Sequence, residues 1–189
     1  MKRIFDIFAS VFGLVLTGPI LLVFMFLVWR QDGFSPFYIA PRVGKAEKPF
    51  PMIKLRSMIK NADKSGVDST ASGDVRITRI GHLIRKFKLD ELTQLLNVLK
   101  GDMSLVGPRP ERAFYVQQIQ EKEALHARIY ITKPGLTSLG MVKFGYARNL
   151  EEIMERMRYD MIYLDNQSIF FDLQILLFTI RTVILGKGI

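Results

Sequence analysis

Two adjacent acids, Asp90 and Glu91, are the residues of this 189-residue sequence whose types and surroundings best fit chemistry. A basic stretch over residues 76–88 precedes them, and leucines at helical spacing follow over residues 92–99. A carboxylate held ionised beside several cations suits a nucleophile or a metal ligand that faces phosphates. Acids at a helix start are also favoured by free backbone N–H groups and by the helix dipole. The pattern therefore leaves two interpretations open: a catalytic pair, or a helix cap with a solvated glutamate.

The net charge of +9 predicts an anionic partner, and most of it belongs to residues 31–189. Such a balance fits nucleic acid, an anionic membrane surface or phosphorylated substrates. No aromatic RNA-binding signature or zinc-ligand pattern accompanies the charge, so nucleic acid is not the expected partner. Cysteine is absent, which excludes disulfides and thiolate chemistry. The two histidines, His82 and His126, are isolated, so we do not expect a histidine-based metal cluster.

Residues 7–29 form an uncharged, apolar run that we expect to enter a membrane. As a straight helix the run would extend roughly 35 Å, enough to cross a bilayer core. It is too long for the apolar region of a signal peptide, so we expect it to stay in the mature protein. Gly18 and Pro19 interrupt it, and proline removes a helical hydrogen bond, which predicts a kink.

Two topologies are compatible with this kinked segment. Membrane helices tolerate proline, so an ordinary single-pass helix is one of them. The other is a re-entrant helix, which enters the membrane and leaves it on the same side. Basic residues flank both ends, with Lys2 and Arg3 before the segment and Arg30 and Arg42 after it. This distribution mildly favours two cytoplasmic ends, and it leaves the single-pass helix as an alternative.

The rest of the chain reads as short elements around one polar segment. Residues 60–75 are rich in Ser, Gly, Asp and Lys, and we expect a mobile loop there. Residues 104–110 read as a rigid loop because two prolines follow a glycine. The other predicted elements are extended segments at 37–40 and 50–58, a short strand at 138–144, and helices at 77–87, 91–99, 111–127, 150–164 and 169–185.

The last of these helices is strongly apolar but is interrupted by Asp172 and Arg181. The uncharged run between these two residues is too short to span a bilayer. It fits a buried core helix or an interfacial helix lying among lipid headgroups, and we favour partial membrane contact. An apolar helix of this kind would serve a homodimer as readily as a membrane.

A series of motifs extends over almost the whole chain. The stretch from Asp74 to Glu111 includes Leu89-Asp90-Glu91-Leu92 and Pro108-Arg109-Pro110. The other motifs are Lys54-Leu55-Arg56-Ser57-Met58, Lys133-Pro134-Gly135-Leu136-Thr137 and Arg158-Tyr159-Asp160. Together these motifs closely resemble the bacterial sugar transferase family, the monotopic phosphoglycosyl transferases, and the stretch from Asp74 to Glu111 is the most specific part of the resemblance.

The resemblance implies an α/β-type, mostly helical fold. It would have a kinked re-entrant membrane helix at residues 1–30 and a compact catalytic domain with interfacial amphipathic helices at residues 31–189. The domain would lie on the cytoplasmic face of the bacterial inner membrane. The implied enzyme is a phosphoglycosyl transferase that moves a sugar-1-phosphate from a UDP-sugar to polyprenol (undecaprenyl) phosphate. It would release UMP and initiate glycoconjugate or exopolysaccharide assembly.

The resemblance also assigns roles to particular residues. Asp90 would be the nucleophile that carries the phosphosugar, and Glu91, with Asp90, would bind Mg²⁺. Lys54 matches a lysine near phosphate, and Arg109 suits bidentate phosphate binding. The remaining implied residues are Arg56 and Arg85 for phosphate or nucleotide, Asp172 as a supporting acid, and Gly18 and Pro19 at the break in the membrane helix.

Some positions depart from the usual pattern of the family. Thr93 stands where a proline is usual, Gly18 stands where serine is common, and Met141 replaces a frequent glutamine. The last change puts substrate contacts near residues 133–142 in doubt. The sequence does not indicate which sugar is transferred. The alternative function is a membrane-anchored protein that binds polyprenol phosphate or anionic lipid without chemistry, and it predicts that Asp90 is dispensable.

Overall fold

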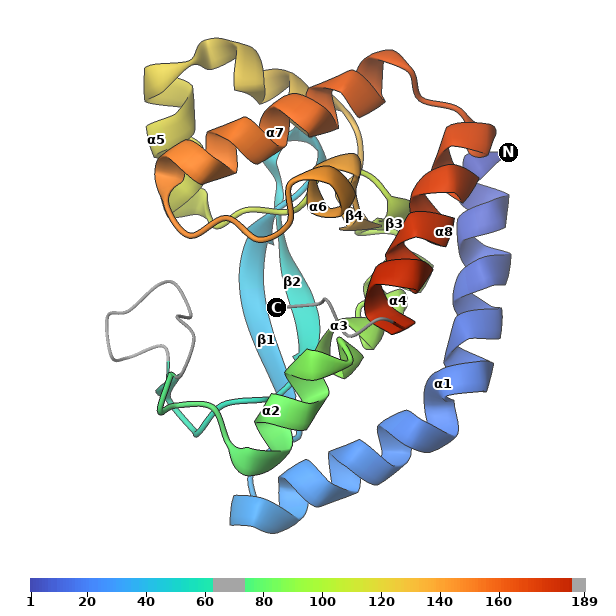
Figure 1. Cartoon of the computed structure of the whole chain (residues 1–189), viewed down its shortest axis with the longest axis vertical. Coiled ribbons are helices and arrows are strands. Elements are labelled where there is room, and N and C mark those ends of the chain that lie inside the picture. Colours follow the sequence, from blue (N-terminus) through green and yellow to red (C-terminus); the bar gives the residue numbers. More distant parts are fainter. Residues whose placement is uncertain (63–73, 185–189) are drawn as a thin grey trace.

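The structure is a computed structural model whose described residues are 1–62 and 74–184 (Figure 1). Over these residues the chain is mostly helical, as predicted, and it contains two small sheets. The loop predicted at 60–75 falls largely on residues 63–73, which lie outside the described residues. The elements in chain order are α1 (Lys2–Asp32), β1 (Phe37–Val43), η1 (Lys45–Glu47), β2 (Pro49–Leu55), α2 (Arg79–Lys86), α3 (Leu89–Leu92), α4 (Leu95–Lys100), β3 (Ser104–Val106), α5 (Ala113–Lys122), η3 (Ala124–Ile131), β4 (Gly135–Thr137), α6 (Leu139–Lys143), α7 (Leu150–Asp165) and α8 (Ile169–Ile184).

The N-terminal helix α1 has 31 residues and is long and apolar enough to cross a membrane. Pro19 lies inside it, and the Thr17 hydroxyl donates to the Gly13 carbonyl at 2.7 Å, a contact that often bends a helix. In Figure 1 the helix changes direction between a part that starts beside α8 and a part that passes α2. The re-entrant topology stays a prediction.

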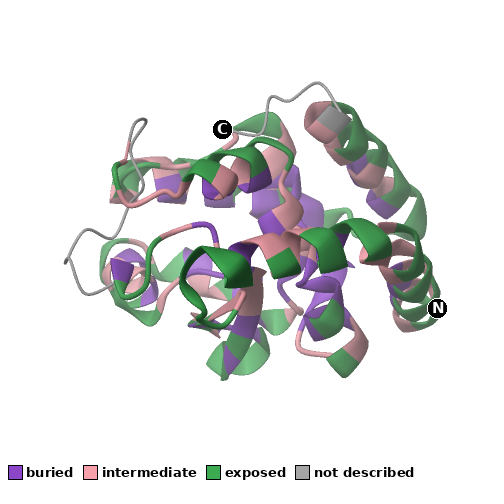
Figure 2. Cartoon of the chain, turned by 90° about the horizontal axis from the view of Figure 1, so that it is seen from below, coloured by how far each residue is buried: buried purple, intermediate pink, exposed green. Residues whose placement is uncertain are grey.

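One side of α1 packs on the body of the protein while most of its apolar side chains are exposed. Asp6, Ser10, Leu21 and Val28 are its buried residues. Figure 2 shows buried residues gathered between the elements and exposed residues on the outer faces of the helices. An outer face this apolar is unusual for a surface in water, and it suits contact with lipid.

Strands β1 and β2 form an antiparallel hairpin in which Tyr38 pairs with Lys54 and Arg42 pairs with Phe50. The strands are longer at one end than the segments predicted from sequence, because pairing continues to Val43 and Pro49. Phe50, Met52 and Leu55 on β2 are buried, so this strand joins the core. The hairpin thereby carries Lys54 at a fixed place beside α3.

Two predictions after residue 100 are corrected. The loop predicted at 104–110 begins with β3, which pairs in parallel with β4. The strand predicted at 138–144 is wrong, because this segment forms the helix α6. The Ser138 hydroxyl accepts the Met141 N–H at 3.0 Å and so caps the helix, a role that serine favours.

The other predicted helices lie where the structure has helices, but their lengths differ from the observed ones. The segment at 91–99 is divided into α3 and α4, and the one at 111–127 into α5 and η3. The predicted helix at 150–164 is confirmed by α7. Its N-cap Asn149 accepts the Glu152 N–H, and its apolar residues Ile153, Met157 and Tyr163 are buried.

Within the described part of the chain, three hydrophobic clusters hold these elements together. The central one contains Val98, Met103, Tyr163 and Ile175 and so joins α4, the start of β3, α7 and α8. The other clusters lie between α5, η3 and α7, and between the C-terminal part of α1, β2 and α2. The third cluster is built on Val28, Leu55 and Ile84, and it fixes one end of α1 against the hairpin that carries Lys54.

Candidate active site

Asp90 lies in the first turn of α3, and the chain reaches it through an unusual turn at Lys88. Lys88 has a φ of 55°, uncommon for a residue other than glycine, and this turn separates α2 from α3. Lys88 is itself the N-cap of α3, and no side chain caps the helix. The interpretation of the acids as a helix cap therefore finds no support in the hydrogen bonds of α3.

Thr93 fastens this short helix to the hairpin. Its hydroxyl lies 3.1 Å from the Ile53 carbonyl of β2 and 3.1 Å from the Asp90 carbonyl. A proline, which the family resemblance leads us to expect at this position, has no hydroxyl to make these contacts. The departure at Thr93 therefore contributes to the placement of the acidic pair.

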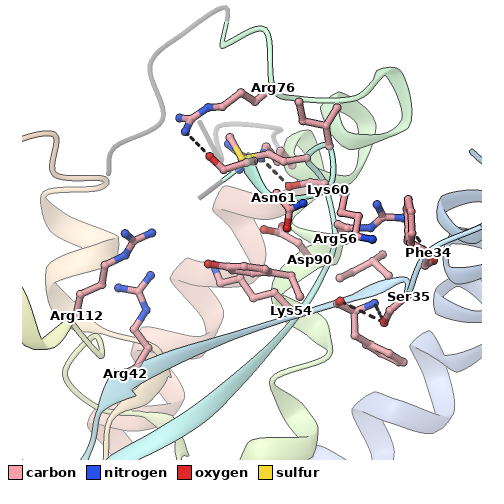
Figure 3. A pocket seen from close by; sticks show the side chains of 18 residues that line it. Phe34, Ser35, Arg42, Lys54, Arg56, Lys60, Asn61, Arg76, Asp90 and Arg112 are labelled. Carbon is pink, nitrogen blue, oxygen red and sulfur yellow. Dashed lines mark hydrogen bonds between the residues drawn. The ribbon is translucent and has the colours of Figure 1, made fainter. Parts of the chain in front are cut away.

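The Asp90 side chain lines a cavity of about 450 Å³ (Figure 3). The walls come from Phe34 and Ser35 after α1, the β1–β2 hairpin, the segment at 56–62, α2 and α3, together with Arg76 and Arg112. Asp90 is the acid among the lining residues, whereas the basic ones are numerous. They are Arg42, Lys54, Arg56, Lys60, Arg76, Arg85 and Arg112. A cavity with this balance of charge attracts anions.

Glu91 points to a different set of partners beside the cavity. Its Oε1 accepts from Lys54 Nζ at 3.3 Å, from Arg109 Nη2 at 3.2 Å and from the Tyr146 hydroxyl at 3.3 Å. Burial alone would raise the pKa of Glu91, but Lys54, Arg109 and Lys88 outweigh it and hold the pKa below its usual range. Burial opposes the charge of Arg109 in turn, yet Glu91 keeps the pKa of Arg109 above its usual value.

Asp90 behaves differently although it is the next residue. Burial raises its pKa, with Glu91 adding to the rise and Lys54 and Arg85 opposing it. Its Oδ1 is buried without a hydrogen-bond partner within the described part of the chain. The two adjacent acids therefore have different environments. Glu91 is held as a carboxylate, and Asp90 has an unsatisfied oxygen that is available to a ligand in the cavity.

These two acids also fit the magnesium ion that the family resemblance implies. Mg²⁺ prefers one or two carboxylates together with substrate phosphates and water. Among the described residues there is no group of three or more His, Cys, Asp or Glu that could hold a metal, so a site made of protein ligands alone is not found there. The unsatisfied Asp90 Oδ1 is a suitable oxygen ligand. Because cations already surround the pair, we expect Mg²⁺ to enter together with a diphosphate.

The loop at 107–110 places Arg109 next to Glu91, and it does so through close backbone contacts. A Cβ on Gly135 would lie 2.2 Å from Gly107 N, so only glycine allows this approach. The Arg109 N–H donates to Asp160 Oδ2 at 3.3 Å, and Gly140 N–H donates to Oδ1 at 2.8 Å. Burial raises the pKa of Asp160 to about 6, although these hydrogen bonds and Arg156 oppose the rise.

Tyr146 is a residue of the site that sequence reasoning missed. Its ring lies 3.6 Å from Lys88 Nζ and 5.1 Å from Arg109 Cζ, both measured to the ring centroid, while its hydroxyl reaches Glu91. Cations are attracted to the face of such a ring. Burial lowers the pKa of Lys88 to about 8, with Glu91 opposing this effect. Nothing in the spacing of the sequence connects Tyr146 with residues near position 90.

The two remaining predicted phosphate ligands are placed differently. The Arg85 Nε donates to the Ser57 hydroxyl at 2.9 Å, and its side chain lines the cavity. Arg56 also lines the cavity, but its guanidinium binds both oxygens of Asp32 at 2.6 Å each and contacts the Val28 carbonyl. Arg56 thus fixes the C-terminal end of α1, and its role toward phosphate stays a prediction.

Asp172 does not join this site. It lies on α8, where it is buried, accepts from the Tyr163 hydroxyl at 2.5 Å and pairs with Lys2 at the start of α1. Gly18 and Pro19 lie within α1 and do not line the cavity. The structure therefore brings together Asp90, Glu91, Lys54, Arg85 and Arg109, with Arg56 at the margin, and leaves Asp172 among contacts that hold α1.

Comparison with known proteins identifies relatives over the whole chain. A model of the family described as bacterial sugar transferase matches residues 1–186. The UDP-N-acetylgalactosamine-undecaprenyl-phosphate N-acetylgalactosaminephosphotransferase of Aeromonas hydrophila is 37% identical over 100% of this chain and 44% of its own length. The sugar transferase EpsL of Bacillus subtilis is 40% identical over 100% of this chain and 90% of its own. The UDP-glucose:undecaprenyl-phosphate glucose-1-phosphate transferase of Caulobacter vibrioides is 34% identical over 97% of this chain and 69% of its own length. The chain thus spans less than half of the first of these relatives.

Proposed function

The chain belongs to the bacterial sugar transferase family, and from this premise we propose that it transfers a sugar-1-phosphate from a UDP-sugar to undecaprenyl phosphate. The names of its relatives support the general reaction, since they describe transferases that act on undecaprenyl phosphate. The chain is therefore an enzyme, a transferase. The relatives' names differ in the sugar, so the identity of the sugar is left to experiment.

We propose that the reaction takes place in two steps at Asp90. An oxygen of the carboxylate forms a bond to the phosphorus that carries the sugar, while the bond from that phosphorus to the UMP oxygen breaks and UMP leaves with the electron pair. A phosphate oxygen of undecaprenyl phosphate then bonds to the same phosphorus and releases Asp90. The product is the undecaprenyl-diphospho-sugar, and dividing one transfer into two is typical of carboxylate nucleophiles.

The cations around the pair have separate tasks in this proposal. Lys54 contacts Glu91 and lines the same cavity as Asp90, so it suits a phosphate held there. Arg109 is held by Glu91 and by the rigid loop, and its fork suits bidentate binding of phosphate. Arg85 adds positive charge on the cavity wall. Mg²⁺, held by Glu91 and Asp90, would offset the charge of the diphosphate and of the departing UMP.

One observation carries the proposal: the unsatisfied Asp90 oxygen lies in a cationic cavity while its neighbour Glu91 is held by three donors. The test incubates the full chain with Mg²⁺ and a panel of UDP-sugars, with and without undecaprenyl phosphate. We expect UMP and, without the acceptor, a gain in protein mass equal to one sugar phosphate.

Asp90→Asn should abolish both signals, whereas the exposed Asp165→Asn should leave them unchanged. Turnover retained by Asp90→Asn would contradict the assignment of the nucleophile. Absence of UMP with every sugar, together with undecaprenyl phosphate binding that survives Asp90→Asn, would favour the alternative of a lipid-binding protein without chemistry.

A re-entrant α1 and a catalytic domain on the cytoplasmic face of the inner membrane belong to the same proposal. The first turns of α1 contact the domain through Arg3, which donates to the Val98 and Leu99 carbonyls, and through Asp6, which accepts from Ser104. The far end contacts the same domain through Asp32 and Arg56. A helix that crossed a bilayer would carry its two ends to opposite faces, about 30 Å apart.

The topology can be tested directly because the chain has no cysteine of its own. Single cysteines introduced beside Met1 and beside Lys45 would be labelled with an impermeant reagent in sealed inner-membrane vesicles. We expect the two positions to react on the same face. Labelling on opposite faces would rule out the re-entrant arrangement.

A further inference from the structure

Two arginines at one end of the cavity have no role in the two-step reaction at Asp90. Arg42 on β1 and Arg112, just before α5, lie side by side there, away from Lys60 and Phe34 at the opposite end (Figure 3). A backbone hydrogen bond from Val43 N–H to the Glu111 carbonyl, at 2.9 Å, joins the residues next to them and so brings the two arginines together. The backbone thus places two like charges on the same wall.

The surroundings of Arg42 leave part of its hydrogen-bonding capacity unused. Its Nε is buried and has no hydrogen-bond partner within the described residues. Burial lowers the pKa of Arg42 to about 10, with Arg109 and Arg112 contributing to the fall and Glu111 opposing it. Bringing guanidinium groups together away from water is costly unless an anion joins them.

The nearest acid does not serve as a full counter-ion for Arg42. The carboxylate of Glu111 is buried and accepts a short hydrogen bond from Arg156 on α7. Positive charge around Arg42 therefore exceeds the negative charge that faces it. A phosphate group, with several acceptor oxygens and up to two negative charges, has the chemistry to satisfy such a site.

We propose that Arg42 and Arg112 form a second phosphate subsite, separate from the cations around Glu91, that binds a phosphate monoester. This inference rests on the proposed function for its ligand. With the transferred phosphorus at Asp90, the other phosphate of the UDP-sugar extends along the cavity, and the Arg42–Arg112 end receives it and keeps it as part of UMP. The phosphate of the lipid acceptor has the same chemistry and is the other source to test.

The experiment measures binding rather than turnover, so that it stands apart from the reaction. The full chain, in lipid nanodiscs, is titrated with UMP, with uridine and with a short-chain polyprenol phosphate. The variants are Arg42→Ala, Arg112→Ala and the bulkier Arg42→Gln, which fills more of the space if alanine weakens the fold. Arg128→Ala is the matched control, because Arg128 is an exposed arginine whose partner is Asp165.

We expect Arg42→Ala and Arg112→Ala each to weaken UMP binding by about 10- to 100-fold, the usual range for a lost charge-assisted hydrogen bond. Uridine binding should not change, since uridine has no phosphate, and the control should bind UMP as the unchanged protein does. Weaker polyprenol phosphate binding with unchanged UMP binding would keep the subsite and assign it to the lipid phosphate.

Three results would overturn the subsite. They are an equal loss for uridine and UMP, unchanged binding of both phosphates in variants that merely unfold at lower temperature, and no binding of either phosphate by the unchanged protein. The proposed function fails separately: weaker UMP binding in the variants, without any sugar-phosphate transfer by the unchanged protein, would retain the subsite and reject the reaction.

Discussion

Asp6 and Asp172 are buried where α1 meets the body of the protein, and Asp90 and Glu91 are buried where the cavity meets α3. At the first place each carboxylate oxygen has a partner: Asp6 accepts from the Ser104 hydroxyl and the Leu105 N–H, and Asp172 accepts from Tyr163 and Lys2. At the second place cations are in excess, and one oxygen of Asp90 has no partner among the described residues.

The difference separates stability from chemistry. A buried carboxylate whose hydrogen bonds are all made contributes to holding α1 on the domain. A buried carboxylate with an unused oxygen, beside cations that repel one another, is unfavourable until a substrate supplies what is missing.

Asp90→Asn should have the largest effect, and it should fall on activity alone. Loss of a nucleophile typically costs at least about 10³-fold in turnover. Stability should change little, because Asp90 Oδ1 makes no hydrogen bond within the described residues and asparagine has nearly the same shape. UMP release and thermal unfolding of the same preparation check both parts. A clear loss of stability with turnover retained would reverse the contrast.

Asp160 offers a test based on the pH dependence of stability rather than on activity. Its pKa is raised to about 6 in the folded protein by burial, against about 3.8 when exposed. The contribution of Asp160 to stability is therefore fully present below about pH 4 and is lost as the pH rises through 6. The pKa difference corresponds to roughly 3 kcal/mol at most. The free energy of unfolding would be measured for Asp160→Asn and for the unchanged protein from pH 4 to pH 7. We expect the unchanged protein to lose stability relative to the variant as the pH rises.

The matching change at the other region, Asp172→Asn, should act on stability. Asparagine still accepts from Tyr163 but no longer pairs with Lys2, which is partly exposed, so we expect a loss of about 1–2 kcal/mol in the free energy of unfolding. Turnover at a temperature where the variant stays folded should be close to normal. A large loss of turnover there would restore the role of supporting acid that the sequence predicted for Asp172.

Tyr146→Phe should give the smallest effect. It removes the hydroxyl that reaches Glu91 and keeps the ring beside Lys88 and Arg109, so a 2- to 10-fold fall in turnover is expected from one weak hydrogen bond. Tyr146→Ala, which also removes the ring, should be worse. Tyr130→Phe is the control, because the buried Tyr130 hydroxyl has no hydrogen-bond partner among the described residues. Equal effects of the two phenylalanine variants would show that Tyr146 has no special place.

Local patterns in the sequence predicted most of the fold. The apolar run of α1 and the periodicity of α7 both reflect neighbours along the chain. The helix α6 was missed because a single hydroxyl, that of Ser138, overcame the extended character of the residues that follow.

The residues of the site fall into two groups, those that local sequence predicts and those that only the fold brings together. Asp90, Glu91, Lys54 and Arg109 were predictable because short motifs contain them. Tyr146 and the Arg42–Arg112 pair were not, since only the folded chain brings them to the cavity or to Glu91. Contacts between residues distant in sequence leave no periodic trace in it.

The attachment of α1 has a practical consequence for making a soluble form of this protein. Through Asp6 the helix supplies the acceptor for Ser104 and for the N–H of Leu105 in β3, and through Arg3 it covers the last carbonyls of α4. Deleting α1 would leave these groups unsatisfied in the middle of the domain. A water-soluble version should therefore keep the helix and replace its outward apolar side chains, such as Phe8, Phe12 and Leu16, with polar ones.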